Sequence, residues 1–140
     1  MAVRVGERSK SRLDAQMRCE ELVRHTVHIC SNERVFDHKY AAFTARIVDT
    51  AITVGLDMWK ANGIKVGDSA DRWRTRHAMQ EDACMQLDAL LYLMGVARRL
   101  YHLRSGKYEH WARLAIETRD LARKWRDSDA RRYGHLVSGT

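Results

Sequence analysis

The residues with the most suggestive chemistry are arginines that recur at helical spacing. Arg119, Arg123 and Arg126 lie at positions i, i+4 and i+7, and Arg72 and Arg76 repeat the four-residue step. On an α-helix these steps place side chains on one face. A planar guanidinium group suits forked contacts with phosphate or carboxylate. Two interpretations are open: a row that binds an anion, or a solvated face whose acids come from neighbouring helices.

A second group of basic residues surrounds a predicted turn near position 105 and comprises Arg98, Arg99, Arg104 and Lys107. The whole chain has 25 Lys and Arg against 18 Asp and Glu, so its formal net charge is +7 at pH 7. A surplus of this size attracts polyanions. Nucleic acid is the commonest such partner in a cytoplasm, although an anionic membrane or an acidic protein would also fit the charge.

Catalytic and metal-binding patterns are not evident in the sequence. His25 and His28 are three residues apart, and they would bind a metal only if another element supplied further ligands. We interpret them as surface or core-edge histidines. No Glu-x-x-His pair, Gly-rich phosphate loop, nucleophile elbow or Cys-x-x-Cys occurs. We therefore expect a protein that is not an enzyme, with no catalytic residue, metal or cofactor.

Helices must position all of these side chains, and the apolar periodicity predicts four of them. Pro is absent, which favours long uninterrupted helices. Apolar residues recurring every three or four positions predict helices over about 9–30, 37–62, 68–104 and 107–127. Because the connections are short, each helix must run antiparallel to the one before it. The predicted fold class is therefore all-α, an antiparallel up-down-up-down four-helix bundle with a long third helix.

Polar residues mark the expected helix ends. Asp37 is a plausible N-cap for the second helix, and Asp68 or Ser69 for the third. Ser105, followed by Gly, ends the third helix and can itself cap the fourth. We expect a single domain over 1–140, with its core in about 9–128 and a flexible C-terminal tail over 129–140.

The predicted buried stripes extend to the outer turns of the first two helices. Leu13 and Met17 continue the apolar stripe of the first helix backward, and Trp59 lies on the apolar side of the second. The three cysteines also fall on apolar faces, where we expect reduced thiols that act as small apolar groups: Cys19, Cys30 and Cys84.

No apolar run approaches the ~20 residues that span a bilayer. The start of the chain, MAVRVGERSKSR, lacks the apolar core of a secretory signal. We therefore expect a cytoplasmic location and no membrane partner.

Two segments resemble a known family of four-helix bundles. KYAAFTARIVDTAITVGLDMWKANG is similar to the family's second helix, and LDALLYLMGVARRLYHLRSGKYEHWARLAIETRDLARKW contains its most typical part, an apolar turn followed by a helix that closes on Trp125. Residues 34–127 thus resemble the family that includes the accessory variability determinant (Avd) proteins of diversity-generating retroelements. That family is related to the bundle proteins encoded in intervening sequences of 23S ribosomal RNA genes.

The resemblance implies a non-catalytic accessory protein. Proteins resembling Avd form basic pentameric barrels that bind the reverse transcriptase of the retroelement and its template RNA or DNA, and mutagenic retrohoming requires them. The implied partners are therefore nucleic acid, reverse transcriptase and further copies of the chain, as a homo-oligomer and by resemblance a pentamer. The basic positions of the matching helices and of the arginine row are the candidate nucleic-acid-binding residues: Arg72, Arg76, Arg98, Arg99, Arg104, Lys107, Arg113, Arg119, Arg123 and Arg126.

A second hypothesis comes from a different class of protein. It is a structural or protein-interaction bundle of the 23S ribosomal RNA intervening-sequence type, whose basic surface binds an acidic protein. Complexes of this kind would survive nuclease treatment, whereas a nucleic-acid complex would not.

Overall fold

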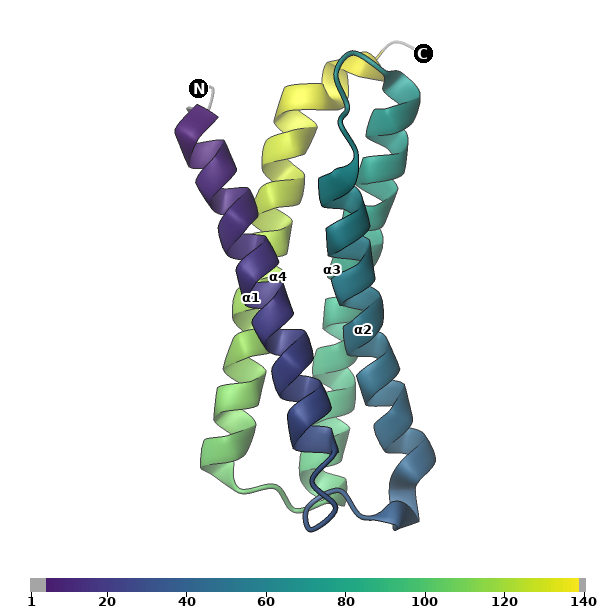
Figure 1. Cartoon of the computed structure of the whole chain (residues 1–140), viewed down its shortest axis with the longest axis vertical. Coiled ribbons are helices and arrows are strands. Elements are labelled where there is room, and N and C mark those ends of the chain that lie inside the picture. Colours follow the sequence, from purple (N-terminus) through teal and green to yellow (C-terminus); the bar gives the residue numbers. More distant parts are fainter. Residues whose placement is uncertain (1–4, 139–140) are drawn as a thin grey trace.

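Four long helices follow one another along the chain and pack side by side (Figure 1). In the computed structural model, which describes residues 5–138, they are α1 (Val5–Cys30), α2 (Ala41–Gly63), α3 (Ala70–Leu100) and α4 (Ser105–Tyr133). Short 3-10 turns precede α2 and follow α4: η1 (His38–Tyr40) and η2 (Gly134–Leu136). Each helix runs antiparallel to its neighbour in sequence, and α4 returns to pack against α1. The predicted all-α, up-down-up-down bundle is confirmed.

The core lies between the apolar faces of the four helices. Its buried side chains on α3 and α4 follow the steps of three and four that the sequence predicts: Ala83, Leu87, Leu90, Met94, Ala97, Trp111, Leu114, Ala115, Ala122 and Trp125. The largest fully buried side chain is Trp111, whose Nε1 donates a hydrogen bond to Thr26 Oγ1 at 3.0 Å. This bond joins α4 to α1 inside the core and leaves the indole N–H satisfied. No helix of the described chain has the length and apolar character needed to cross a membrane.

All three cysteines face the core as free thiols. Burial raises the pKa of Cys19 to about 12, with a further increase from the charge of Glu20. Burial alone raises the pKa of Cys30 to about 12, and it also raises the pKa of Cys84. The thiols therefore stay protonated at neutral pH and act as small apolar groups, as predicted.

The outer turns of α1 and α2 differ from the prediction. Leu13, Met17 and Trp59 are exposed, with 54%, 68% and 72% of their surface accessible. The buried line of α2 runs through Val54 and Met58, and Trp59 follows one position later, rotated by about 100° around the helix axis. The predicted stripe was therefore too wide, because an apolar residue beside a buried line need not itself be buried.

The turn between α3 and α4 also differs from the prediction. Helix α3 ends at Leu100 rather than near position 104. His102 adopts a left-handed conformation with φ of 53°, and the N–H of Leu103 donates to the carbonyl of Arg98 at 3.0 Å. This bond is typical of a Schellman helix end. Leu103 is buried, which fixes the turn against the core.

The C-terminal segment predicted as a flexible tail is helical for most of its length. Helix α4 continues to Tyr133 because Asp129 faces the interior and is buried. Its Oδ2 lies 2.7 Å from Nη2 and 2.8 Å from Nε of Arg76 on α3, and it also accepts a hydrogen bond from Gln80 at 2.7 Å. The prediction of a tail beginning at 129 was wrong over this stretch, while residues 139–140 lie outside the described part of the chain.

The same ion pair corrects the placement of Arg76, which the sequence suggested as an exposed anion-binding residue. Only 6% of its surface is exposed. Its Nη1 donates to the carbonyl of Ile64 at 2.9 Å, and its guanidinium lies 5.1 Å from the ring centre of Trp125. Arg76 therefore holds the α2–α3 turn and α4 together and is not available to an external ligand.

We predict that Asp129→Ala lowers the free energy of unfolding by about 3–5 kcal/mol, because it leaves a buried guanidinium without its counter-ion. Urea denaturation followed by circular dichroism measures this loss. The control is Asp127→Ala, which removes an exposed carboxylate 3.1 Å from Arg126 and should cost no more than about 1 kcal/mol. Equal effects of the two substitutions would contradict the structural role of the buried pair.

Candidate polyanion-binding surface

The end of α3 and the start of α4 bring four predicted basic residues to one end of the bundle, the lower end in Figure 1. We call this set the basic end: Arg98, Arg99, Arg104 and Lys107. All four side chains are exposed. None of them forms an ion pair with an acid of the described residues. The basic end therefore presents positive charge that the protein does not itself neutralise.

The tight turn after α3 positions these groups. Arg98 and Arg99 occupy the last turn of α3, where a helix favours positive charge, and Arg104 is the N-cap residue of α4. The guanidinium of Arg98 lies 4.6 Å from the ring centre of Tyr108, which restrains its orientation. A chain reversal of only a few residues thus places cations from two helices side by side.

The arginine row on α4 has a different environment. Arg123 and Arg119 both face Asp88 on α3, at 3.2 and 3.8 Å, and Arg126 lies 3.5 Å from Glu81 on the same helix. Acids from a neighbouring helix therefore partner the row, which is the arrangement expected of a solvated face. The Arg123–Asp88 pair, with 41% and 53% of the two side chains exposed, contributes little stability and can exchange for another anion. Arg119 and Arg126 are only 26% and 24% exposed, so the row is at most an extension of the basic end.

The remaining two predicted residues stand apart from both groups. Arg113 is exposed on α4, between the basic end and the arginine row, and Arg72 is exposed on the first turn of α3 at the opposite end of the bundle. Neither forms an ion pair with a described acid. The ten predicted positions therefore do not form one surface.

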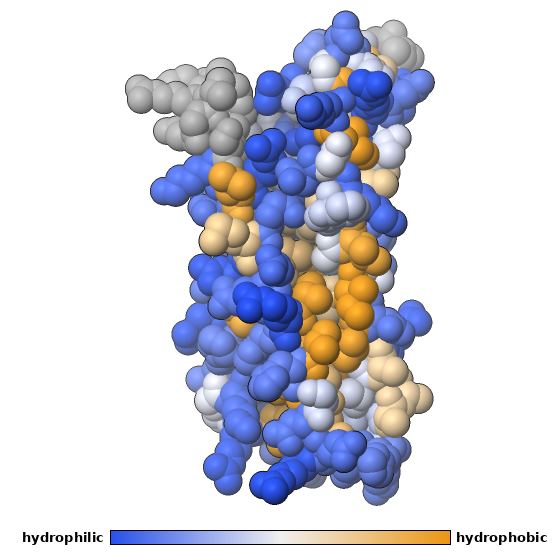
Figure 2. All heavy atoms as spheres, in the orientation of Figure 1, coloured by the Kyte–Doolittle hydropathy of each residue, from blue (hydrophilic) through white to orange (hydrophobic). Residues whose placement is uncertain are grey.

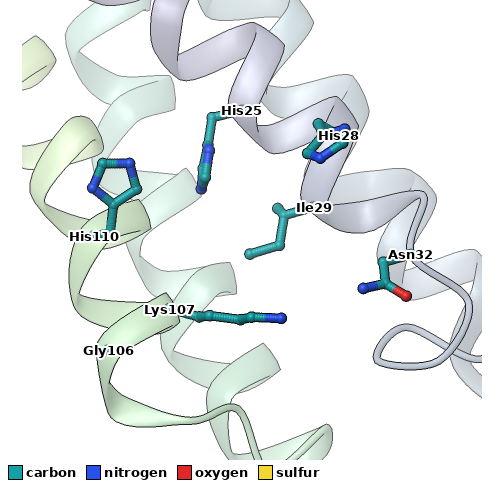
Figure 3. A pocket seen from close by; sticks show the side chains of 7 residues that line it. All are labelled: His25, His28, Ile29, Asn32, Gly106, Lys107 and His110. Atoms are coloured by element: carbon teal, nitrogen blue, oxygen red, sulfur yellow. The ribbon is translucent and has the colours of Figure 1, made fainter.

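A pocket near the basic end contains residues that the sequence did not bring together. Its volume is about 330 Å³, and its lining includes His25, His28 and Asn32 from α1 and the loop after it, and Gly106, Lys107 and His110 from α4 (Figure 3). The rings of His25 and His110 are 4.9 Å apart, edge to face. We call this the histidine pocket. The contact with α4 was not foreseeable from the spacing on α1 alone.

A metal is not the natural occupant of this pocket. Among the described residues, no group of three or more His, Cys, Asp or Glu side chains has an arrangement that could hold a metal ion. His110 does supply an imidazole from a second element, the condition that His25 and His28 needed, but the three imidazoles do not converge on one point.

A pair of carboxylates lies where α3 packs against α2. Asp57 of α2 faces Asp82, and burial together with the Asp82 carboxylate raises the pKa of Asp57 to about 7, against a smaller opposing effect of Lys60. Oδ2 of Asp57 is buried without a hydrogen-bond donor among the described residues. A proton shared between the two carboxylates would satisfy this oxygen.

An apolar face accompanies these polar features. Large exposed side chains from α1 and α2 make up this face: Leu13, Met17, Ile52, Leu56 and Trp59. A groove of about 410 Å³ runs between the two helices and includes three of these side chains in its lining. Figure 2 shows apolar atoms gathered on this side of the molecule. Large apolar side chains that gather in this way on one side of a protein often mark a protein–protein contact.

Comparison of the chain with protein-family models, with curated proteins and with solved structures finds no significant match.

We predict that Asp57→Asn stabilises the protein at pH 8 and has little effect near pH 4. Because the folded-state pKa of Asp57 is raised, the folded protein retains a proton that the unfolded chain loses as the pH rises from about 4 to 7. The free energy of unfolding of the wild-type protein therefore falls over this range. The Asp57→Asn side chain is an amide that cannot ionise, so the variant does not lose this stability. Urea denaturation at several pH values measures the difference. An Asp57→Asn effect that does not change with pH would contradict the shared proton.

Proposed function

We propose that this chain is a non-catalytic accessory protein that binds nucleic acid through the basic end. The observation that carries the proposal is the cluster of exposed cations at Arg98, Arg99, Arg104 and Lys107, which have no acidic partner among the described residues. The net charge of +7 also favours association with a polyanion.

Binding of this kind rests on phosphate contacts. Three of the four cations are arginines, whose guanidinium groups form forked hydrogen bonds with phosphate oxygens. Such contacts position a nucleic acid but carry no sequence information, so the proposed binding is weakly sequence-specific. Four phosphate contacts with a single strand predict an affinity loss of about 50-fold between ~50 and ~200 mM salt.

The resemblance to Avd proteins suggests which complex the protein serves. On this proposal the partners are the reverse transcriptase of a diversity-generating retroelement and its template RNA or DNA, and the process is mutagenic retrohoming. The polymerase active site belongs to the partner, so no catalytic residue is proposed here. A neighbouring reverse transcriptase gene with paired template and variable repeats would support this assignment, and its absence would count against it.

The proposed assembly is a homo-oligomer, by resemblance a pentamer. The apolar face supports this part of the proposal, because water would otherwise surround Met17, Leu56 and Trp59. Burying exposed side chains of this size contributes on the order of 1.5–3 kcal/mol each. The apolar face comes from α1 and α2, whereas most of the basic end comes from α3 and α4. Self-association through the apolar face would therefore leave the basic end accessible to nucleic acid.

We predict that the double substitution Arg99→Glu with Arg104→Glu weakens binding to single-stranded RNA and DNA at least tenfold in ~50 mM salt. Fluorescence anisotropy with labelled oligonucleotides measures the affinity. Because two phosphate contacts are lost, the slope of log affinity against log salt should also fall in magnitude by about 1.4.

The matched control is Lys124→Glu with Arg131→Glu, at exposed positions far from the basic end. It changes the net charge by the same amount but leaves the four cations in place, so it should retain most of the affinity. Equal losses in the two variants would show that only net charge matters. If wild-type protein binds no nucleic acid in ~50 mM salt, while a nuclease-resistant complex with an acidic protein forms, the protein-interaction alternative replaces this proposal.

We also predict that Met17→Lys with Trp59→Lys reduces the mass of the particle in solution, since it places charge on both sides of the groove between α1 and α2. Light scattering measures the mass. The control is Met85→Lys with Tyr92→Lys, which alters two side chains of α3 that are equally exposed, at 67% and 71%. A wild-type protein with the mass of a monomer would refute the oligomer.

A further inference from the structure

The histidine pocket gathers hydrogen-bond donors that the protein does not use. None of the imidazoles of His25, His28 and His110 forms a hydrogen bond or ion pair with a described residue, and neither does the amine of Lys107. Nε2 of His25 is buried and has no hydrogen-bond partner among the described residues, whereas a buried polar atom normally has one. His28, His110 and Lys107 are exposed and can donate to a molecule from solution. Together, the unsatisfied nitrogen and the three accessible donors indicate a place for a ligand.

The pocket has the charge and shape of an anion site. Figure 3 shows His25 and His110 projecting into the space between α1 and α4, with Lys107 extending across it toward Asn32. No acid belongs to its lining, and its volume of about 330 Å³ is ample for a phosphate group. The pocket also lies beside the first turn of α4, whose N-terminus has no side-chain cap. The partial positive charge of that helix end reinforces the same preference.

The surroundings of His25 disfavour the positive charge that a bound anion would stabilise. Burial lowers the pKa of His25, and the nearby His110 and His28 lower it further. Glu21 on α1 acts in the opposite direction, but Arg18 already occupies that carboxylate at 2.9 Å. An anion placed among the imidazoles would favour their protonated forms and gain a second hydrogen-bond donor from each.

We propose that the histidine pocket binds a phosphoryl dianion, either inorganic phosphate or the terminal phosphate of a monoester. The inference does not depend on binding along the basic end, because one phosphate fits within the pocket. Its chemical basis is that three imidazoles and one ammonium from two helices line a space that has no acid in its lining. Protonation of the imidazoles accompanies binding, so the affinity for an anion of constant charge increases as the pH falls.

The test is a titration of the full chain with inorganic phosphate, followed by the imidazole signals in nitrogen–proton correlation spectra at about pH 6 and pH 8. Sulfate serves as a second probe because its charge is constant over this range. We expect saturable shifts confined to His25, His28 and His110. We also expect sulfate affinity to be at least about tenfold higher at pH 6, since each imidazole whose pKa rises by one unit contributes up to tenfold.

The variant Lys107→Gln with His110→Gln should lose at least tenfold in phosphate affinity. Lys124→Gln with His135→Gln makes the same changes at the other end of the bundle and should lose nothing. Retained binding in the pocket variant, or no saturable shifts in wild-type protein, would overturn the proposal. Saturation of the same histidines by zinc ions without any response to phosphate would also overturn it and would assign the pocket to a metal.

A further arm identifies the source of the phosphate. If an oligonucleotide with a 5′-phosphate shifts the three histidines more strongly than its 5′-hydroxyl counterpart and inorganic phosphate do, the ligand is a nucleic-acid end. If inorganic phosphate or a nucleoside monophosphate binds as well as the phosphorylated oligonucleotide, the ligand is a small free phosphate. Both results support the phosphoryl site. Failure of nucleic-acid binding at Arg99 and Arg104 would leave the phosphate titration unaffected.

Discussion

The abrupt reversal of the chain between α3 and α4 is the constraint on which the polar surface of this protein depends. Buried Leu103 and the left-handed backbone of His102 end α3 and allow α4 to begin at Ser105. A longer connection would separate the last turn of α3 from the first turn of α4. Because the connection is short, cations from both helices meet at one end of the bundle, and the uncapped start of α4 faces α1 across the histidine pocket. Both candidate binding sites are therefore consequences of one turn.

The arginines of this chain show that the surroundings of a guanidinium group decide whether it stabilises the fold or stays available to a ligand. Arg76 is enclosed by Asp129, Trp125 and the carbonyl of Ile64, where removal of its partner would leave an isolated buried charge. Arg123 is half exposed and shares Asp88 with another arginine of the row, so its ion pair is weak and exchangeable. Arg99 has no acidic partner among the described residues. Only the last environment leaves the full charge available to an external polyanion.

Apolar periodicity was sufficient to predict the bundle and its topology, because each helix must bury one face and short connections force antiparallel neighbours. It was not sufficient to place Arg76 and Asp129, although both continue buried stripes, Arg76 after Trp73 and Asp129 after Trp125. An acid and a base that continue facing stripes were the available signal for a buried pair. The basic end could be predicted because its four residues lie within ten positions of one another in the sequence. The histidine pocket could not, because its halves come from α1 and α4, and sequence spacing does not specify the register of one helix against another.

The placement of the three thiols gives the bundle a built-in reporter of its own opening. Cys19 and Cys30 lie on α1 and Cys84 on α3, and all are buried and protonated in the closed structure. Alkylating reagents attack the thiolate, so each cysteine reacts only during moments when its helix leaves the core. Because the sites are spread over two helices, their separate modification rates would distinguish detachment of α1 from loosening of α3. The three cysteines of the sequence are therefore sufficient to follow which helix leaves the core first, without any added label site.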